Sequence, residues 1–174
     1  MKRLIPMVLA SAAFAFALSL GATRVAAAAE VNPYRLAEAP QDASDVIALR
    51  SDAKGKQDVV VVGRIGGRQN PWIKGMAAFS LVDRSLKPCN EIEGDTCKTP
   101  WDYCCESDLG KATLLVTFVD ESGKIIKQDA RELLGVKELD TLTIVGKAKR
   151  DPSGNVTVLA SKVYVPAPED ETTP

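Results

Sequence analysis

The sequence predicts a mainly β fold: a five-stranded barrel with one short helix and a long cysteine-containing insert between its second and third strands. Three observations lead to this fold class. Five apolar segments have the β-branched composition or the alternation of strands, and glycine and proline turns separate them. Residues 84–110, a polar stretch between the second and third segments, contain all the cysteines of the chain.

The N-terminal residues, 1–29, have the three-part pattern of a secretory signal peptide. Met1–Arg3 is positively charged, residues 4–20 are almost wholly apolar, and Ala27–Ala29 places small residues before a cleavage point at Glu30. The apolar run is short for a membrane-spanning helix, and no stop-transfer segment follows it. We therefore expect an exported protein, periplasmic or secreted, with no membrane span once the signal peptide is removed.

Residues 30–57 lead into the barrel and contain one short helix. Ser44 is the expected N-cap, because its hydroxyl can accept a hydrogen bond from a backbone N–H of the first turn. Gly55 follows the last helical position and should end the helix.

The barrel itself is expected over residues 58–165. Its strands are predicted at 59–62, 76–82, 114–119, 141–149 and 155–165, with a short helix at 130–134. The turn between the last two strands, Asp151–Gly154, has proline and glycine in positions that a tight turn favours. Three strands, a helix and a two-stranded hairpin follow one another in the order of an OB barrel. The acidic, proline-containing residues 166–174 are expected to form a disordered tail.

The four cysteines are the most concentrated chemical signal in the chain. Cys89, Cys97, Cys104 and Cys105 are spaced C-x7-C-x6-C-C. In an oxidising compartment an even number of cysteines in one polar loop predicts disulfides. A direct bond between Cys104 and Cys105 would close a strained ring. Two pairings therefore remain, Cys89–Cys104 with Cys97–Cys105 or Cys89–Cys105 with Cys97–Cys104.

Two other uses of the cysteines are open. Four thiolates can complete a tetrahedral site for zinc or copper, although adjacent ligands differ from the usual C-x2-C pairs. Thiol redox chemistry is the other use, and the absence of a C-x-x-C arrangement weakens it. Because disulfides are the preferred interpretation, the sequence predicts no resident metal and no cofactor.

A candidate binding surface accompanies the cysteines. It consists of Trp72, Asp95, Trp101, Asp102 and Tyr103, and the insert to which most of them belong has three basic and six acidic residues, a net charge of −3. Such a surface would attract a cation or a basic partner. The simpler alternative is that the two insert aromatics fold back as a small core of the insert.

Particular segments carry a resemblance to known proteins. They are residues 61–67 (VVGRIGG), residues 94–105 (GDTCKTPWDYCC), and the strand ends at 145–146 and 163–165. Over roughly residues 45–165 the chain resembles a group of uncharacterised exported bacterial OB-fold proteins. The cysteine segment is the specific part of this resemblance, because the strand motifs are common to OB barrels. The resemblance implies an OB fold and export, and it implies no activity.

Composition excludes several function classes. The chain has no histidine, which removes Ser-His-Asp and Cys-His catalysis and imidazole metal sites. Without the signal peptide, 19 basic residues (22 − 3) stand against 23 acidic ones, a net charge of −4. Proteins that bind nucleic acid backbones are usually basic. A local basic patch could still form from Arg64, Arg68, Lys74, Lys147, Lys149 and Arg150.

The sequence therefore predicts a non-enzymatic, exported binding or scaffold module with no catalytic residue. Its recognition surface would be the disulfide-braced insert, and its partner an unknown protein or small ligand of the cell envelope. A thiolate metal-binding or redox protein is the alternative, and an oligonucleotide-binding OB fold is a weaker one. The oligomeric state is open.

Overall fold

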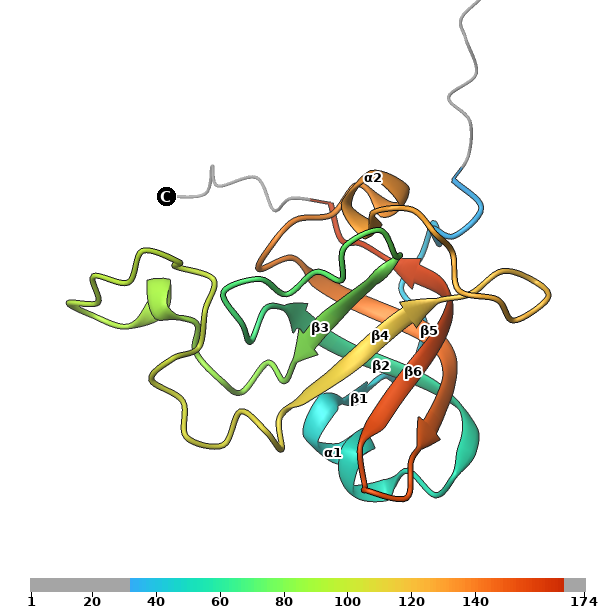
Figure 1. Cartoon of the computed structure of the whole chain (residues 1–174), viewed down its shortest axis with the longest axis horizontal. Coiled ribbons are helices and arrows are strands. Elements are labelled where there is room, and N and C mark those ends of the chain that lie inside the picture. Colours follow the sequence, from blue (N-terminus) through green and yellow to red (C-terminus); the bar gives the residue numbers. More distant parts are fainter. Residues whose placement is uncertain (1–31, 168–174) are drawn as a thin grey trace, which may run out of the picture. The chain divides into compact units, whose positions relative to one another are not determined.

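A computed structural model describes residues 32–167 of the chain (Figure 1). The predicted signal peptide, residues 1–29, lies outside the described residues, as do residues 168–174 of the predicted tail. No helix within the described range has the length and apolar character needed to cross a bilayer.

The fold is mainly β, as the sequence predicts. The elements in chain order are β1 (Ser44–Asp45), α1 (Val46–Asp52), β2 (Lys56–Ile65), β3 (Ala78–Val82), the 3-10 helix η1 (Cys89–Glu91), β4 (Thr113–Phe118), α2 (Ala130–Leu134), β5 (Thr141–Arg150) and β6 (Val156–Tyr164). The predicted helices and the predicted C-terminal hairpin are thus present.

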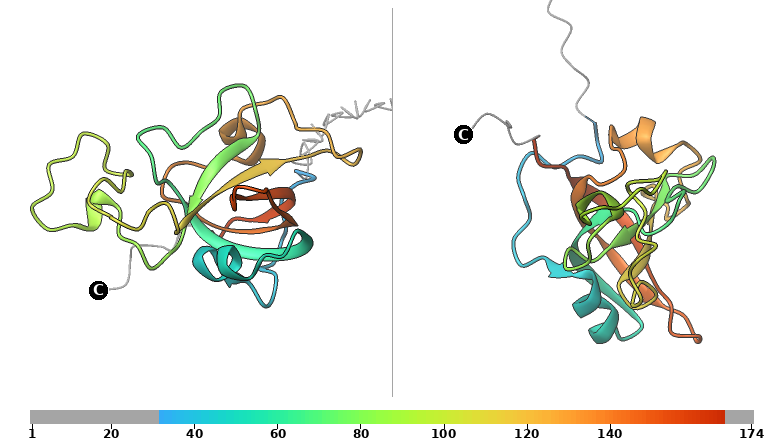
Figure 2. Two further views of the ribbon diagram at one scale, coloured as in Figure 1. Left: turned by 60° about the horizontal axis from the view of Figure 1, so that its bottom comes forward. Right: turned by 90° about the vertical axis from the view of Figure 1, so that its left-hand side faces the viewer.

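The strands form one mixed, six-stranded sheet in the order β1-β2-β3-β4-β6-β5. A further pairing joins β2 to β5 along nine residue pairs, from Lys56–Lys149 to Arg64–Thr141. The strands β2, β3, β4, β6 and β5 therefore make a closed ring of hydrogen-bonded neighbours, in which only β4 and β6 run parallel. Figures 1 and 2 show α1 and α2 near opposite ends of these strands.

The sequence does not predict the short strand β1. The predicted number of strands, five, is therefore corrected to six. Ser44 and Asp45 pair in parallel with Val61 and Val62 of β2. Ser44 is consequently a strand residue and not the helix cap. The carboxylate of Asp83 accepts the 2.7 Å hydrogen bond from the Ile47 N–H in the first turn of α1 instead. A cap contributed from so far along the chain leaves no local sequence signal.

One main hydrophobic core fills the inside of the ring. Val46 and Leu49 of α1 and Ala130 and Leu134 of α2 belong to the same cluster as the strand residues. Three aromatic side chains contact one another in it. The Trp72 and Phe79 rings meet edge to face with their centroids 5.8 Å apart, and the Phe79 and Phe118 rings are tilted with their centroids 6.4 Å apart. Burial of these apolar faces supplies most of the stability of a domain of this size.

The short helix α2 has defined ends. The side chain of Asp129 accepts a hydrogen bond from the Arg131 N–H at the start, and Gly135 follows the last turn with φ of +64°. Glycine adopts this left-handed conformation without the steric strain that a Cβ would bring. Both signals are local, which explains why the sequence predicts this helix correctly.

The insert, residues 84–110, projects beyond the ends of β3 and β4 as the yellow-green loop of Figures 1 and 2. Its only helical turn is η1. Everything else in it is turn and irregular structure, so separate backbone hydrogen bonds and side-chain contacts hold its shape in place of a strand ladder.

Candidate functional site

Tyr103 lies at the centre of a small core that the insert shares with the end of β3 and the residues before β4. This side chain is 0% exposed and packs with Val82, Leu86 and Ala112 in a second cluster, separate from the main core. Gly66 makes room for the ring, because a Cβ at that position would lie 2.7 Å from Tyr103 Cε2. Of the two insert aromatics, Tyr103 thus packs inward, whereas Trp101 is partly exposed and does not belong to this cluster.

Backbone hydrogen bonds bring the two halves of the insert together. The Cys89 N–H donates to the Asp102 carbonyl over 2.8 Å, and the Asn90 N–H donates to the Pro100 carbonyl over 3.0 Å. One side-chain contact ties the insert to the sheet, and another ties it to the β2–β3 loop. Arg64 of β2 forms a 2.6 Å ion pair with Glu91, and the Trp101 indole N–H donates to the Gln69 carbonyl over 3.0 Å.

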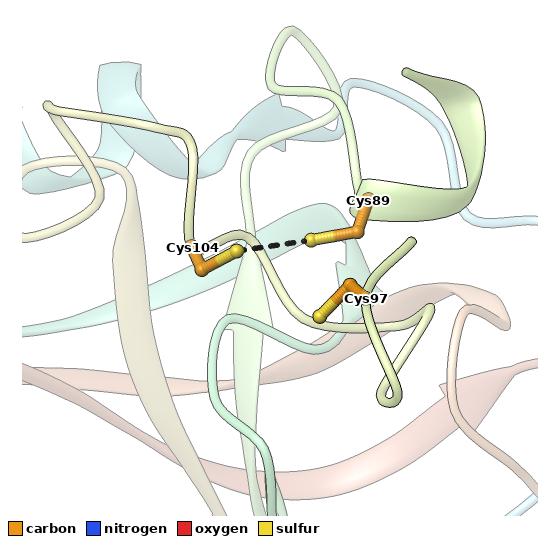
Figure 3. A group of neighbouring side chains, drawn as sticks. All are labelled: Cys89, Cys97 and Cys104. Atoms are coloured by element: carbon orange, nitrogen blue, oxygen red, sulfur yellow. Dashed lines mark hydrogen bonds between the residues drawn. The ribbon is translucent and has the colours of Figure 1, made fainter. Parts of the chain in front are cut away.

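These constraints gather three of the four cysteines (Figure 3). The sulfurs of Cys89, Cys97 and Cys104 all lie within 4.8 Å of one another, and those of Cys89 and Cys104 are 3.5 Å apart. Cys105 lies beside this group, with its sulfur 3.9 Å from that of Cys104. We call Cys89, Cys97 and Cys104 the sulfur triad.

The four cysteines are free thiols in this structure. Even the Cys89 and Cys104 sulfurs, at 3.5 Å, are well beyond the disulfide bond length of about 2.05 Å. The two-disulfide prediction consequently stays a prediction. Cys104 lies near both Cys89 and Cys97, so each of the two pairings has one of its bridges between neighbouring sulfurs.

The three thiols of the triad differ in their environments. The hydroxyl and backbone of Thr99 lower the pKa of Cys97, whereas burial raises the pKa of Cys89 to about 12. The pKa of Cys104 is also raised, since Cys105 and burial outweigh the hydrogen bond from Cys89. Cys97 is therefore the first of the three to ionise.

The predicted binding surface is divided by the fold. Tyr103, Asp102 and Trp72 are buried, with 0%, 8% and 6% exposure, while Trp101 and Asp95 stay partly exposed. The indole of Trp72 makes its polar contacts with residues in or near α2 and not with the insert. Its N–H donates to Glu138, and the Arg131 guanidinium lies over its ring. Three of the five residues are thus packed inside the protein.

A cleft that sequence reasoning missed lies where the insert returns to the sheet. Its volume is about 550 Å³, and its wall includes two arginines, Arg50 and Arg68. Leu109, Ile73 and Leu115 give it an apolar side. None of the described residues that line it is acidic. The lining comes from α1, the β2–β3 loop, β3, the insert, β4, the β5–β6 loop and β6, so no single stretch of sequence signals it.

The positive charge of this cleft is not neutralised by the protein. Within residues 32–167 neither arginine forms an ion pair with a carboxylate. One Arg50 N–H donates to the Thr113 carbonyl over 2.7 Å. Burial, and then the charge of Arg150, lowers the pKa of Arg50. An anion in the cleft would relieve this unfavourable accumulation of positive charge.

A second, larger cleft of about 750 Å³ lies elsewhere, between β2, β5 and the loop that follows β4. Val59, Val145 and Leu159 line it together with charged residues. Two of those charges, Lys147 and Asp58, are paired with each other. Lys56, Asp120 and Glu121 also line this cleft and form no ion pair among the described residues, so its charges are mixed in sign, whereas the smaller cleft has two arginines and no acid.

No protein-family model matches the chain, and no curated protein matches it.

Proposed function

We propose that the chain is an exported OB-fold binding module whose ligand site is the cleft at the base of the insert. The ring order β2-β3-β4-β6-β5, the parallel β4–β6 pair and a helix between β4 and β5 support an OB barrel. OB barrels bind ligands on the face of their second and third strands and on two adjoining loops.

The position of the cleft carries the proposal. In an OB barrel of this order the second and third strands are β3 and β4, and Ser80, Leu114 and Leu115 of these strands line the cleft. The loop between β2 and β3 contributes Gly67 and Arg68, and the end of the β5–β6 loop contributes Asn155. This is the face that OB barrels use for binding, which supports the proposal. Because fold alone does not define a ligand, the chemistry of the lining must do so.

The lining fits a small anion with an apolar body. Arg50 and Arg68 supply charge-assisted hydrogen-bond donors for a carboxylate, sulfate or phosphate group. Ile73 and Leu115, exposed by 40% and 36%, offer apolar contact nearby. No described aromatic residue lines the cleft, so it lacks the stacking platform on which oligonucleotide binding relies. The proposal is therefore a binding module for an amphipathic anion.

The probe for this proposal is 8-anilinonaphthalene-1-sulfonate, which joins an aromatic body to one sulfonate. Titration of the isotope-labelled protein should move the backbone amide signals of Gly67, Gly110 and Leu115. The variant Arg68→Gln should weaken binding about tenfold, the equivalent of ~1.4 kcal/mol. Lys149→Gln removes the same charge from an exposed position on β5 and should leave the affinity unchanged.

Two results would contradict the cleft assignment. Signal changes confined to Val145 and Gly146 would place the probe in the other, larger cleft. Equal affinities for Arg68→Gln and Lys149→Gln would show that the arginine takes no part in binding. Melting temperatures of both variants close to that of the parent protein serve as the control for folding.

Export is the remaining part of the proposal, and the pattern of residues 1–29 supports it. Protein recovered from the producing bacterium should have an intact mass that corresponds to a start near Glu30. A mass that still includes residues 1–29 would contradict cleavage.

A further inference from the structure

We propose that the sulfur triad is a binding site for one Cu(I) ion, with Cys89, Cys97 and Cys104 as its three ligands. This site is separate from the cleft, and its ligand and chemistry are different.

The spacing of the sulfurs already approaches that of a three-coordinate metal site. A metal–sulfur bond of about 2.3 Å places the sulfurs of a trigonal site about 4.0 Å apart. In the free protein, Cys89 and Cys104 are 3.5 Å apart and all three sulfurs lie within 4.8 Å. Side-chain adjustments below about 1 Å would therefore complete the coordination.

The backbone around each ligand is held independently of any metal. Cys89 is buried, and its N–H is bonded to the Asp102 carbonyl. Cys97 lies in a tight turn, in which its N–H donates to Asp95 over 2.9 Å. Cys104 directly follows the buried anchor Tyr103. Ligands that are positioned before the metal arrives lose little conformational freedom on binding.

Both the type and the number of ligands favour Cu(I). An all-sulfur set is soft, which selects Cu(I) or zinc among the common ions. Zinc in structural sites is almost always four-coordinate. The chain has no histidine, and among the described residues no carboxylate oxygen joins the three sulfurs within 4.8 Å. Cys105 is outside this group as well. Among the described residues the site thus brings three sulfurs together, and Cys105, whose sulfur is 3.9 Å from that of Cys104, lies beside them without joining the group.

Binding is a ligand exchange without electron transfer. Each thiol that coordinates releases its proton to water and binds as a thiolate, and copper enters and stays as Cu(I). The competing reaction is oxidation, in which Cys89 and Cys104 lose two electrons and two protons to an external oxidant and form a disulfide.

The test is a titration of the reduced, purified protein with Cu(I) in the absence of oxygen, against the chromophoric chelator bicinchoninate. One copper should bind per chain, and X-ray absorption should show three sulfur neighbours. Cys97→Ser should weaken binding by more than the roughly 10- to 100-fold typical of losing a residue that only supports a ligand. Cys105→Ser, the matched control in the adjacent position, should bind as the parent protein does.

Three outcomes would overturn the inference. An equal loss in Cys105→Ser and Cys97→Ser would indicate a four-sulfur site. Displacement of copper by equimolar zinc would indicate a zinc site. A reduced protein that takes up no copper, and that regains a mass 4 Da below the reduced value in air, would indicate two structural disulfides. Unchanged circular dichroism of the serine variants separates each of these from a loss of folding.

Discussion

At the scale of the residue, Tyr103 is unusual because it is fully buried in the middle of a polar insert. Its ring fills the second core, but its hydroxyl has no hydrogen-bond partner among the described residues. Burial raises the pKa of Tyr103, and the nearby positive charge of Arg64 partly opposes this rise. One N–H of the Arg64 guanidinium is bonded to Glu91, and the Tyr103 hydroxyl itself makes no hydrogen bond within the described residues.

The variant Tyr103→Phe should therefore keep the stability of the protein, or increase it by about 1 kcal/mol, because it removes an unpaired buried polar group. Urea unfolding of the reduced protein measures this free energy. Tyr103→Ala is the comparison, and the cavity that it leaves should lower the free energy of unfolding by about 3 to 5 kcal/mol. A clear loss in Tyr103→Phe would mean that the hydroxyl has a partner, for instance an ordered water.

Asp83 is the second residue with an effect beyond its neighbours. It is 3% exposed, and its carboxylate accepts hydrogen bonds from the backbone of Ile47 and from the backbone and hydroxyl of Ser85. Burial alone would raise the pKa of Asp83, but these hydrogen bonds outweigh it and hold the pKa below the ordinary value of 3.8. The ionised side chain joins α1 to the start of the insert.

The pKa of Asp83 is lower in the folded protein than in the unfolded chain, so the ionised carboxylate stabilises the fold. This stabilisation is fully present above the ordinary pKa of 3.8. It is lost as the pH falls through the pKa of the folded state. Asp83→Asn should lower the free energy of unfolding by about 2 kcal/mol near neutral pH. The difference from the parent protein should shrink as the pH falls below that value.

Urea unfolding at neutral and acid pH measures this difference. Asp108→Asn, which changes an exposed carboxylate, is the control and should have no effect at either pH. A difference between Asp83→Asn and the parent protein that stays constant with pH would contradict the assignment.

At the scale of the element, β5 and β6 depend on one glycine. The register of this pair shifts between Val145 and Gly146. A Cβ on Gly146 would overlap the Leu159 carbonyl oxygen and would lie 2.9 Å from Ala160 Cα. Backbone atoms cannot move away as a flexible side chain could, so the close approach of the strands requires glycine here.

We expect Gly146→Ala to lower the free energy of unfolding by about 3 kcal/mol through this overlap. Gly110→Ala is the matched control, because a Cβ there would meet no atom within 4 Å. It should be neutral in the same thermal or urea measurement. A Gly146→Ala protein as stable as its parent would mean that β5 and β6 can separate at the bulge without loss.

Local signals explain which elements the sequence predicts. The turn residues Asp151–Gly154 define the hairpin of β5 and β6, and Gly135 ends α2. The start of β3 is less well predicted. The sequence places it at Met76, but the Met76 N–H bonds to the Ile73 carbonyl in a turn, and the strand begins at Ala78. The alternation of apolar and polar residues does not show that a turn hydrogen bond takes the place of strand pairing at Met76.

At the scale of the whole molecule, the sequence predicts the chemistry of the candidate sites better than their geometry. It identifies the insert cysteines as the main chemical signal. It cannot show that Cys97 joins Cys89 and Cys104 while Cys105 stays outside, because this arrangement depends on contacts between residues distant in sequence, such as the backbone hydrogen bond from Cys89 to Asp102. The cleft is not predicted at all, because Arg50 and Arg68 are distant in sequence and line the same cleft only in the folded protein.

The closure of the strand ring has a consequence for how this chain folds. The β2–β5 pairing joins residues 56–65 to residues 141–150, and the parallel β4–β6 pairing also needs the last strand. Contacts this distant in sequence require the loss of loop entropy before they stabilise anything, so folding should be slow, on the order of milliseconds to seconds. Until the last hairpin arrives, β2 and β4 have open edges that can pair with other chains. Aggregation is therefore a greater hazard for this protein before the ring closes than at any time afterwards.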